Sequence, residues 1–225
     1  MGKAEILAPI KNFADRALEV VFPPFCWHCD EPATLSQPLC SSCVKLLDIL
    51  PLADPLVTFE GQGPAWTLMK ALKSGKAPRL AEGLAGYMAL QYLKSDLPLP
   101  DFIVPVPQSL HRSLKVGYNP SLLLAQHLGK TLDRPVLQLL KRKRQLFCQM
   151  KVDRERRYLL SAENFQWKKR VPIAEKKILL VDDIVGTGAT LRACAQRLYE
   201  GFPLKVIKIG SLRQELPQQS HGPVL

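Results

Sequence analysis

The spacing of hydrophobic residues changes along the chain, and from Phe102 onward two patterns alternate. Short apolar runs bounded by proline or charged residues are typical of buried strands, whereas apolar residues three or four positions apart are typical of helices. The apolar runs lie at residues 102–107, 177–181 and 205–209. This alternation predicts an α/β domain.

Helix signals between these runs support the same interpretation. Asn119 suits the N-cap position and a proline follows it, so a helix is predicted through Leu128, with Gly129 placed to end it. A second helix is predicted over 191–200, ending at Gly201. Strands joined by helices run parallel, and such sheets bind ligands beyond the carboxyl ends of their strands. We therefore expect the binding site in the loops that follow the first two strands.

The first hundred residues are less regular. Residues 4–22 have apolar positions at helical spacing and precede two prolines, which predicts an amphipathic helix. This helix either packs on the body of the protein or lies on a membrane surface, and its weakly basic polar face favours packing. Further helices are predicted over 68–72 and 80–93.

Four cysteines form two Cys-x-x-Cys pairs, namely Cys26, Cys29, Cys40 and Cys43. In a reducing compartment such pairs bind metal more often than they form disulfides, and four converging thiolates complete the tetrahedral shell that zinc prefers. Four sulfur ligands leave no open position, so a structural Zn2+ module is predicted. A redox-active pair is the alternative, and His28, inside the first pair, is expected not to ligate.

Bulk properties place limits on the class of protein. The chain has 225 residues, of which 47% are hydrophobic and 23% charged, as in a folded soluble protein. We expect one domain at 51–213, a small module at 1–50 and a disordered tail at 214–225. No apolar stretch has the length of a membrane helix, and the opening segment lacks the features of a secretory signal, so a cytoplasmic location is expected.

The most informative segment follows the strand at 177–181. Asp182 and Asp183 end this strand, and a turn with two glycines then leads into a helix N-terminus between two threonines. Glycines let the backbone wrap closely around a ligand, and the free N–H groups of a helix N-terminus favour phosphate. The carboxylates can accept hydrogen bonds from a vicinal diol. The combination predicts a site for a phosphorylated ribose.

Other glycine-rich loops are excluded by residue identity. A P-loop requires a lysine that this turn lacks, and a dinucleotide-binding loop requires a third glycine where Leu191 stands. A receiver domain also begins with a strand and an acidic pair, but only 42 residues follow Asp183, too few for its remaining elements.

The segment resembles the phosphoribosyl pyrophosphate (PRPP) signature of type I phosphoribosyltransferases, and nearly the whole chain is similar to the ComF family. The matching features, in order, are the four cysteines, Lys-Ser-Gly at 73–75, Val-Pro-Val-Pro at 104–107, Gly-Tyr-Asn at 117–119, a basic stretch containing Gln149, and the acidic loop.

This resemblance implies a type I phosphoribosyltransferase fold with a mobile hood over the site. It also implies that Asp182 holds the ribose 3′-hydroxyl, that Asp183 holds the 2′-hydroxyl, and that Arg112 meets the pyrophosphate, which carries Mg2+. The residues implied to hold the 5′-phosphate are Val185, Gly186, Thr187, Gly188, Ala189 and Thr190.

The chain departs from the family pattern in two places. The usual Arg-Gly-Phe-Asn-Gln reads Val-Gly-Tyr-Asn-Pro at 116–120, and a leucine stands near position 160 where an asparagine is common. Both changes concern the pyrophosphate and the acceptor rather than the ribose. The sequence therefore predicts PRPP binding more directly than phosphoribosyl transfer to an acceptor, which no motif identifies.

The distribution of charge keeps a second function open. The net charge of +11 favours polyanionic partners, and residues 141–157 hold eight basic residues against two acidic ones. Phe147 lies within this stretch and Tyr158, Phe165 and Trp167 follow it, a composition that suits single-stranded DNA. The alternative is a solvated hood whose charge binds pyrophosphate. The resemblance to ComF adds an accessory role in DNA uptake and natural transformation, with a helicase-like competence partner.

Overall fold

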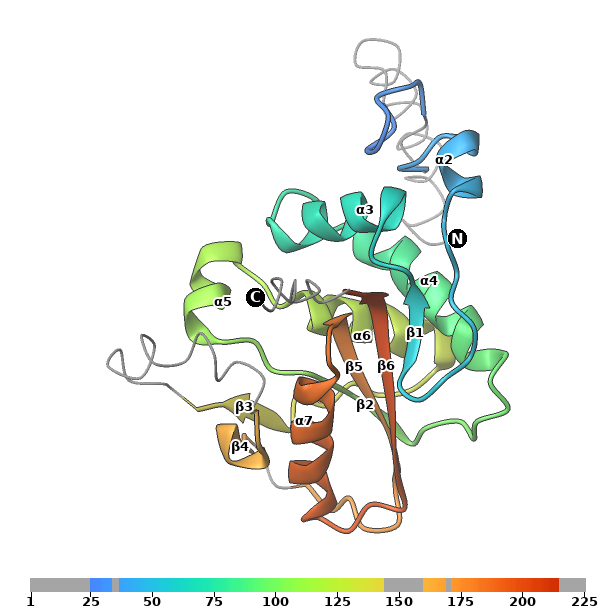
Figure 1. Cartoon of the computed structure of the whole chain (residues 1–225). Coiled ribbons are helices and arrows are strands. Elements are labelled where there is room, and N and C mark those ends of the chain that lie inside the picture. The colour runs from blue at the N-terminus through green and yellow to red at the C-terminus, as the bar shows by residue number, and fades with distance from the viewer. Residues whose placement is uncertain (1–24, 34–36, 144–159, 169–170, 215–225) are drawn as a thin grey trace, which may run out of the picture.

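The computed structural model describes residues 25–33, 37–143, 160–168 and 171–214, which fold around a parallel sheet (Figure 1). The strand order is β1-β6-β5-β2, and each neighbouring pair runs parallel. These strands are β1 (Leu56–Phe59), β2 (Phe102–Pro105), β5 (Lys177–Val185) and β6 (Lys205–Arg213). The expected α/β class, a mainly parallel sheet flanked by helices with a small four-cysteine module, is confirmed.

Helices cover both faces of this sheet (Figure 1). The other elements are α2 (Ser41–Lys45), α3 (Gly63–Lys73), α4 (Leu80–Leu93), α5 (Leu110–Val116), α6 (Pro120–Leu132), β3 (Leu140–Arg142), a 3-10 turn (Ala162–Asn164), β4 (Phe165–Trp167) and α7 (Ala189–Tyr199). Leu179 and Val181 of β5 pack in one buried cluster with α3, α4 and α6, whereas Ile178 and Leu180 pack in a second with α7. Strand β5 is apolar at consecutive positions because both of its faces are covered.

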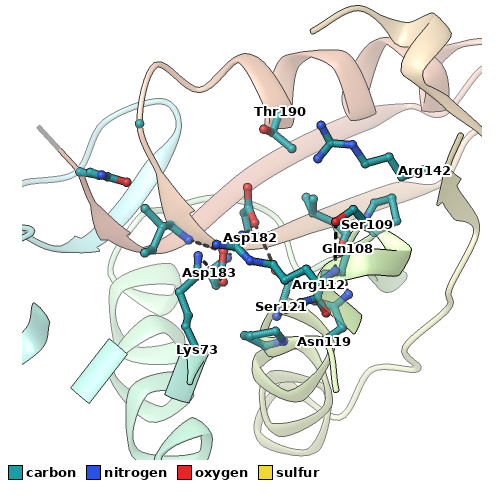
Figure 2. Close-up of a pocket in the computed structure, with 16 residues that line it drawn as sticks. Lys73, Gln108, Ser109, Arg112, Asn119, Ser121, Arg142, Asp182, Asp183 and Thr190 are labelled. Carbon is teal, nitrogen blue, oxygen red and sulfur yellow. Dashed lines mark hydrogen bonds and ion pairs between the residues drawn. The ribbon is translucent and has the colours of Figure 1, made fainter. Parts of the chain in front are cut away.

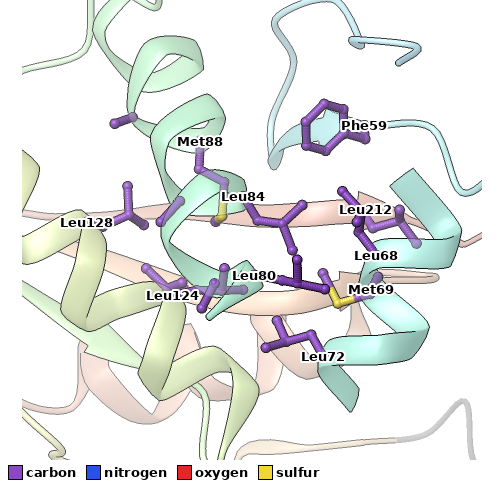
Figure 3. Packing of buried hydrophobic residues seen from close by; sticks show 14 of the residues in the cluster. Phe59, Leu68, Met69, Leu72, Leu80, Leu84, Met88, Leu124, Leu128 and Leu212 are labelled. Atoms are coloured by element: carbon purple, nitrogen blue, oxygen red, sulfur yellow. The ribbon is translucent and has the colours of Figure 1, made fainter. Parts of the chain in front are cut away.

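The larger core holds α3 and α6 in fixed positions. Leu84 and Met88, one turn apart on α4, lie between leucines of α6 and the apolar side of α3 (Figure 3). Burying each such side chain contributes roughly 1.5–3 kcal/mol. The consequence for the site is that the C-terminal end of α3 and the N-terminal end of α6 are both anchored beside the sheet.

Two strands are longer than their apolar runs predict. Strand β5 continues four residues beyond Val181, and β6 continues to Arg213, because the ladder between them extends to the pair Val185–Arg213. Asp182 and Asp183 therefore lie inside β5, and the prediction that they end the strand is wrong. The parallel partner β6 offers backbone hydrogen bonds that the sequence of β5 alone does not reveal.

The helix ends also differ from the predictions in part. Helix α6 runs past Gly129 to Leu132, and Asp133 in a left-handed conformation (φ 52°) caps it. A Cβ atom at Gly129 would lie 2.7 Å from Val136 Cγ2, so this glycine permits close packing rather than ending the helix. Helix α4 has the bounds predicted, α3 is longer than 68–72, and α7 begins at Ala189 and ends one residue before Glu200.

Some sequence predictions concern residues outside the described ranges. These are the amphipathic helix at 4–22, residues 144–157 of the basic stretch with Gln149, and the tail after Gln214. Among the helices of the described ranges, none has the length and apolar character needed to cross a membrane.

Candidate functional site

A pocket of about 250 Å³ opens at the carboxyl ends of β2 and β5 (Figure 2). Its polar and charged side chains are Lys73, Gln108, Ser109, Arg112, Asn119, Ser121, Arg142, Asp182, Asp183, Thr190 and Gln214. They come from α3, the loop after β2, α5, the start of α6, β3, β5, α7 and the residue that follows β6. Figure 2 shows Lys73 beside Asp183, with Thr190 and Arg142 across the pocket. The sheet edge thus gathers groups that are distant in sequence.

The two aspartates are buried but still line the pocket. Asp182 is 7% exposed and Asp183 is 8% exposed, and both border the pocket. Asp182 Oδ1 accepts hydrogen bonds from the Ser121 hydroxyl at 3.2 Å and from the Asp183 amide at 2.9 Å. Asp183 Oδ1 accepts from the Ile184 amide at 2.8 Å, and its Oδ2 lies 2.8 Å from Lys73 Nζ. Among the described residues, Asp182 Oδ2 has no hydrogen-bond donor and is available to a ligand.

Burial and mutual repulsion set the protonation of this acidic pair. Burial raises the pKa of Asp182 to about 7, the neighbouring charge of Asp183 adds to this effect, and Lys73 opposes it. The carboxyl group of Asp182 therefore exchanges its proton near neutral pH, unlike an ordinary aspartate.

Two arginines supply positive charge on the other walls of the pocket. Arg112 is exposed on α5, and Arg142 is partly buried on β3. Burial lowers the pKa of Arg142, and the charge of Arg112 lowers it further. Two cations that repel each other across a pocket create a positive potential suited to an anionic ligand.

The turn between β5 and α7 presents backbone amides. Gly188 has φ 72° and precedes the first residue of α7, so a left-handed residue makes the bend. Thr187 stabilises the turn internally, because its hydroxyl accepts from the Ala189 amide at 3.2 Å and its carbonyl accepts from Arg192 at 2.7 Å. Within the described chain, the amides of Gly186, Thr187 and Gly188 have no acceptor. This turn has the donors that an anion requires.

Only part of the predicted site residues line the pocket. Those that do are Asp182, Asp183, Arg112, Gly186 and Thr190. Those of the turn that do not are Val185, Thr187, Gly188 and Ala189. The Val185 side chain is buried against Gly210, where a Cβ atom would lie 2.2 Å from Val185 Cγ2. The roles of all these residues in binding remain predictions.

The structure adds residues that sequence reasoning left out of the site. Lys73, Asn119 and Ser121 all line the pocket, and Asn119 also donates to the Val106 carbonyl at 2.9 Å. Lys73 and Asn119 belong to the short motifs that carry the family resemblance. That signal could have placed them at the site, whereas nothing local marks Ser121.

The four cysteines converge on one point. Their sulfur atoms all lie within 4.8 Å of one another, and Cys29 Sγ lies 3.6 Å from Cys40 Sγ and 3.4 Å from Cys43 Sγ. Four sulfurs at about 2.3 Å from one zinc ion would be roughly 3.8 Å apart, so the cluster fits a tetrahedral ion. His28 instead contacts the Thr67 hydroxyl at 3.0 Å.

Comparison with known proteins identifies the family. The "DNA utilization protein YhgH" of Escherichia coli O157:H7 is 30% identical to this chain over 183 residues, which cover 77% of each protein. The chain belongs to the ComF family. A further ComF relative, "Competence protein F" of Haemophilus influenzae, is 28% identical over 194 residues and 78% of each protein. No protein-family model matches the chain.

Solved structures similar to this ComF chain are distant. A hypoxanthine-guanine phosphoribosyltransferase from Bacillus anthracis has 14% identity and a TM-score of 0.40 over 66% of this chain and 76% of that one. A purine phosphoribosyltransferase from Pyrococcus horikoshii has 15% identity and a TM-score of 0.40 over 64% and 91%.

Replacing Asp182 with asparagine tests the cost of burying this acid. A folded-state pKa near 7 means that the unfolded chain releases the proton between about pH 4 and pH 7 while the folded chain keeps it, so stability falls as pH rises through this window. We expect the free energy of unfolding of Asp182→Asn at pH 8 to be higher than that of the wild type by on the order of 2 to 4 kcal/mol. Near pH 4 the difference should be much smaller. Urea unfolding at a series of pH values measures this. A difference that does not depend on pH would contradict the assignment.

Proposed function

We propose that this ComF-family protein binds PRPP in the pocket at the ends of β2 and β5. The observation that carries the proposal is the pair of buried carboxylates, Asp182 and Asp183, beside a turn with unpaired amides. A vicinal diol has two hydroxyl donors at the spacing of two adjacent acceptors, and buried charge-assisted hydrogen bonds contribute about 1.5 to 3 kcal/mol each. The ribose of PRPP carries such a diol.

The 5′-phosphate is assigned to the turn before α7. The amides of Gly186, Thr187 and Gly188 have no other acceptor in the described chain, and α7 directs its positive end toward them. The Thr190 side chain lines the same pocket and adds a hydroxyl donor. Val185 and Ala189, which were also named from the sequence, do not line the pocket, so we assign them the role of positioning the backbone of the turn.

The diphosphate is assigned to the cationic walls. Arg112 and Arg142 line the pocket on the side of α5 and β3, whereas Lys73 is already paired with Asp183. A magnesium ion bound to the diphosphate would supply further charge neutralisation when PRPP is present. The magnesium ion is proposed from the sequence resemblance to phosphoribosyltransferases. The metal-binding cluster found among the described residues, that of the four cysteines, is a separate site.

Phosphoribosyl transfer is the reaction that such a complex supports. The anomeric C1′–O bond breaks and its electron pair leaves with pyrophosphate, while the lone pair of an acceptor nitrogen forms the C1′–N bond. An N–H proton of the acceptor, where present, passes to solvent. Cationic side chains stabilise the leaving group, and the acidic pair favours the positive charge that develops on the sugar. Residue 116 is a valine rather than the usual arginine, so Arg112 has the larger share of this task.

The double substitution Asp182→Asn and Asp183→Asn tests PRPP binding. We expect the affinity for PRPP with Mg2+ to fall by more than about tenfold, because two charge-assisted hydrogen bonds to the diol are lost. Isothermal titration calorimetry measures the dissociation constant. Asp133→Asn, an exposed residue at the end of α6, is the matched control and should bind as the wild type does. Unchanged affinity in the double variant would refute the assignment.

We propose that the four-cysteine cluster holds one structural zinc ion. Burial and the neighbouring thiols raise the pKa of Cys43, so this thiol needs a compensating cation in order to ionise. The cluster packs against the main core, because Cys26 and Cys43 belong to the same buried cluster as α3 and α4.

Metal analysis of cysteine variants tests the zinc module. We expect about one zinc per chain after dialysis, and loss of most of it in Cys43→Ser, because three thiolates bind zinc less tightly than four. Elemental analysis measures the content, and Cys194→Ala, which alters a buried thiol of α7 away from the cluster, should retain the metal. A wild-type protein that stays folded without zinc and binds none would contradict the module.

A second function is favoured by cations beside the site. A neighbouring pocket of about 740 Å³ is lined by Lys141, Arg142, Lys143 and Lys168, and the residues that line it include no acid. The names of two relatives refer to competence and to DNA utilization. We propose that this face contacts single-stranded DNA in a DNA-uptake role. The helicase-like partner implied by the family resemblance remains a prediction.

Salt titration tests the DNA contact. Each phosphate contact on a single strand contributes about 0.7 to the slope of log K against log salt, so the triple variant Lys141→Gln, Lys143→Gln and Lys168→Gln should lower that slope by about 2. Fluorescence anisotropy with an oligo-dT probe measures it. Lys130→Gln, on the exposed side of α6, is the control. Absence of binding by the wild type at low salt would eliminate this function.

A further inference from the structure

A second pocket adjoins the proposed PRPP site on the side of α3. It has a volume of about 530 Å³ and lies between α3 and α5. It shares Lys73, Arg112, Ile184 and Gln214 with the PRPP pocket, so the two are continuous. The pocket of about 740 Å³ beside β3 and β4, to which DNA contact is assigned above, adjoins the PRPP pocket on another side, where the two share Asn119 and Arg142. The PRPP site thus has two different neighbours.

The orientation of the ribose decides which neighbour faces the reacting carbon. In the proposed complex the 5′-phosphate lies at the turn before α7, the 3′-hydroxyl at Asp182 and the 2′-hydroxyl at Asp183. The anomeric carbon is bonded to the carbon that bears the 2′-hydroxyl, so it lies on the side of Asp183. Lys73 forms its ion pair with Asp183 at 2.8 Å, and Ile184 follows Asp183 in the chain. Both residues border the α3–α5 pocket. An acceptor that attacks the anomeric carbon therefore approaches from this pocket.

The walls of the α3–α5 pocket combine an aromatic surface with positive charge. Trp66 is partly buried against the core and presents its ring to the pocket, and Lys70 Nζ lies 5.9 Å from the centroid of that ring. Ile184 adds an apolar surface. Lys115 and Arg112, both exposed on α5, add cations, and the residues that line this pocket include no acid.

These features select among acceptors. A planar ring stacks on an indole with a contribution of about 1 to 3 kcal/mol, and the cations around Trp66 favour a ring that carries negative charge. A neutral base would leave these cations without a counter-charge and would find few acceptors for its own N–H groups.

We infer that the α3–α5 pocket binds the acceptor, and that the acceptor is a planar nitrogen-containing ring bearing a carboxylate. This inference rests on the proposed function, since it uses the ribose orientation given above. The carboxylate faces Lys70 and Lys115, the ring lies on Trp66, and the ring or amino nitrogen points toward the anomeric carbon. The pocket beside β3 and β4, which lacks an aromatic wall in the described chain, is left for polyphosphate or DNA.

Binding of small rings to the full chain tests the inference. The probes are orotate, nicotinate and anthranilate as planar carboxylates, uracil and hypoxanthine as neutral rings, and malonate as a non-planar anion. Quenching of tryptophan fluorescence, with and without PRPP and Mg2+, measures the dissociation constants. We expect at least one planar carboxylate to bind about tenfold more tightly than every neutral ring and than malonate.

Variants locate that binding. Trp66→Leu should lose the quenching and weaken carboxylate binding about tenfold, while calorimetric PRPP affinity stays within about twofold. Lys115→Gln, an exposed substitution that keeps the fold, should weaken binding of the carboxylate severalfold and leave that of the neutral rings unchanged. Lys130→Gln is the charge-matched control and should have no effect.

The outcomes separate this inference from the proposed function. Equal binding of neutral and carboxylate rings, or wild-type carboxylate affinity in both Trp66→Leu and Lys115→Gln, would overturn the inference. So would loss of PRPP affinity in Trp66→Leu, which would assign the pocket to the diphosphate, or displacement of the carboxylate by an oligo-dT strand. Failure of the wild type to bind PRPP refutes the proposed function itself, whether or not the rings bind.

Discussion

Two acidic residues at consecutive positions of a buried strand repel each other, and the arrangement of the site follows from how the fold compensates them. Asp183 has an ion pair with Lys73, and Asp182 has hydrogen bonds from Ser121 and from the backbone. The compensation is incomplete, because the pKa of Asp182 is raised to about 7. A buried carboxyl group with one unused oxygen gains when a hydroxyl donor reaches it. The burial of the acidic pair within β5 is thus an unfavourable term that a bound diol would reduce.

The compensating groups come from helices held by one core. Lys73 is the last residue of α3, and Ser121 lies in the first turn of α6, so both depend on the leucine-rich packing around α4 (Figure 3). Because Ser121 donates to Asp182, the N-terminal end of α6 lies close to this carboxylate, and a helix N-terminus favours the ionised form. Core and site are therefore connected, since a shift of α3 or α6 would leave a buried charge without its partner.

The elements that sequence predicts well are those whose signals are local. The apolar runs located β2, β5 and β6, the spacing over 80–93 gave α4 its bounds, and the acidic pair with its glycine turn marked the pocket edge. The errors have long-range causes. The end of β5 is set by pairing with β6, and Gly129 is required by a contact with Val136 rather than by a helix end.

The same distinction applies to the site residues. Lys73 is more than a hundred positions from Asp183, and Ser121 is sixty-one positions from Asp182, so only tertiary packing brings each to its partner. No periodicity or spacing within either segment encodes that meeting. Arg112 and Arg142 are likewise far apart in sequence and meet at the pocket only through the fold, although the net positive charge of the chain indicates that some cations serve an anionic ligand.

The distribution of charged side chains across the three adjoining pockets favours a ligand with a matching distribution of charge. Acids occupy the middle of the proposed site, and cations without acids line the pockets on either side. A ligand with uncharged hydroxyls at its centre and anionic groups at its ends matches this order, as PRPP does. A DNA strand has no 2′-hydroxyl and carries evenly spaced phosphates, so the two aspartates repel it from the centre. The proposed DNA contact is therefore assigned to the flanking surface around Lys141 and Lys168, where a strand would not compete with the sugar.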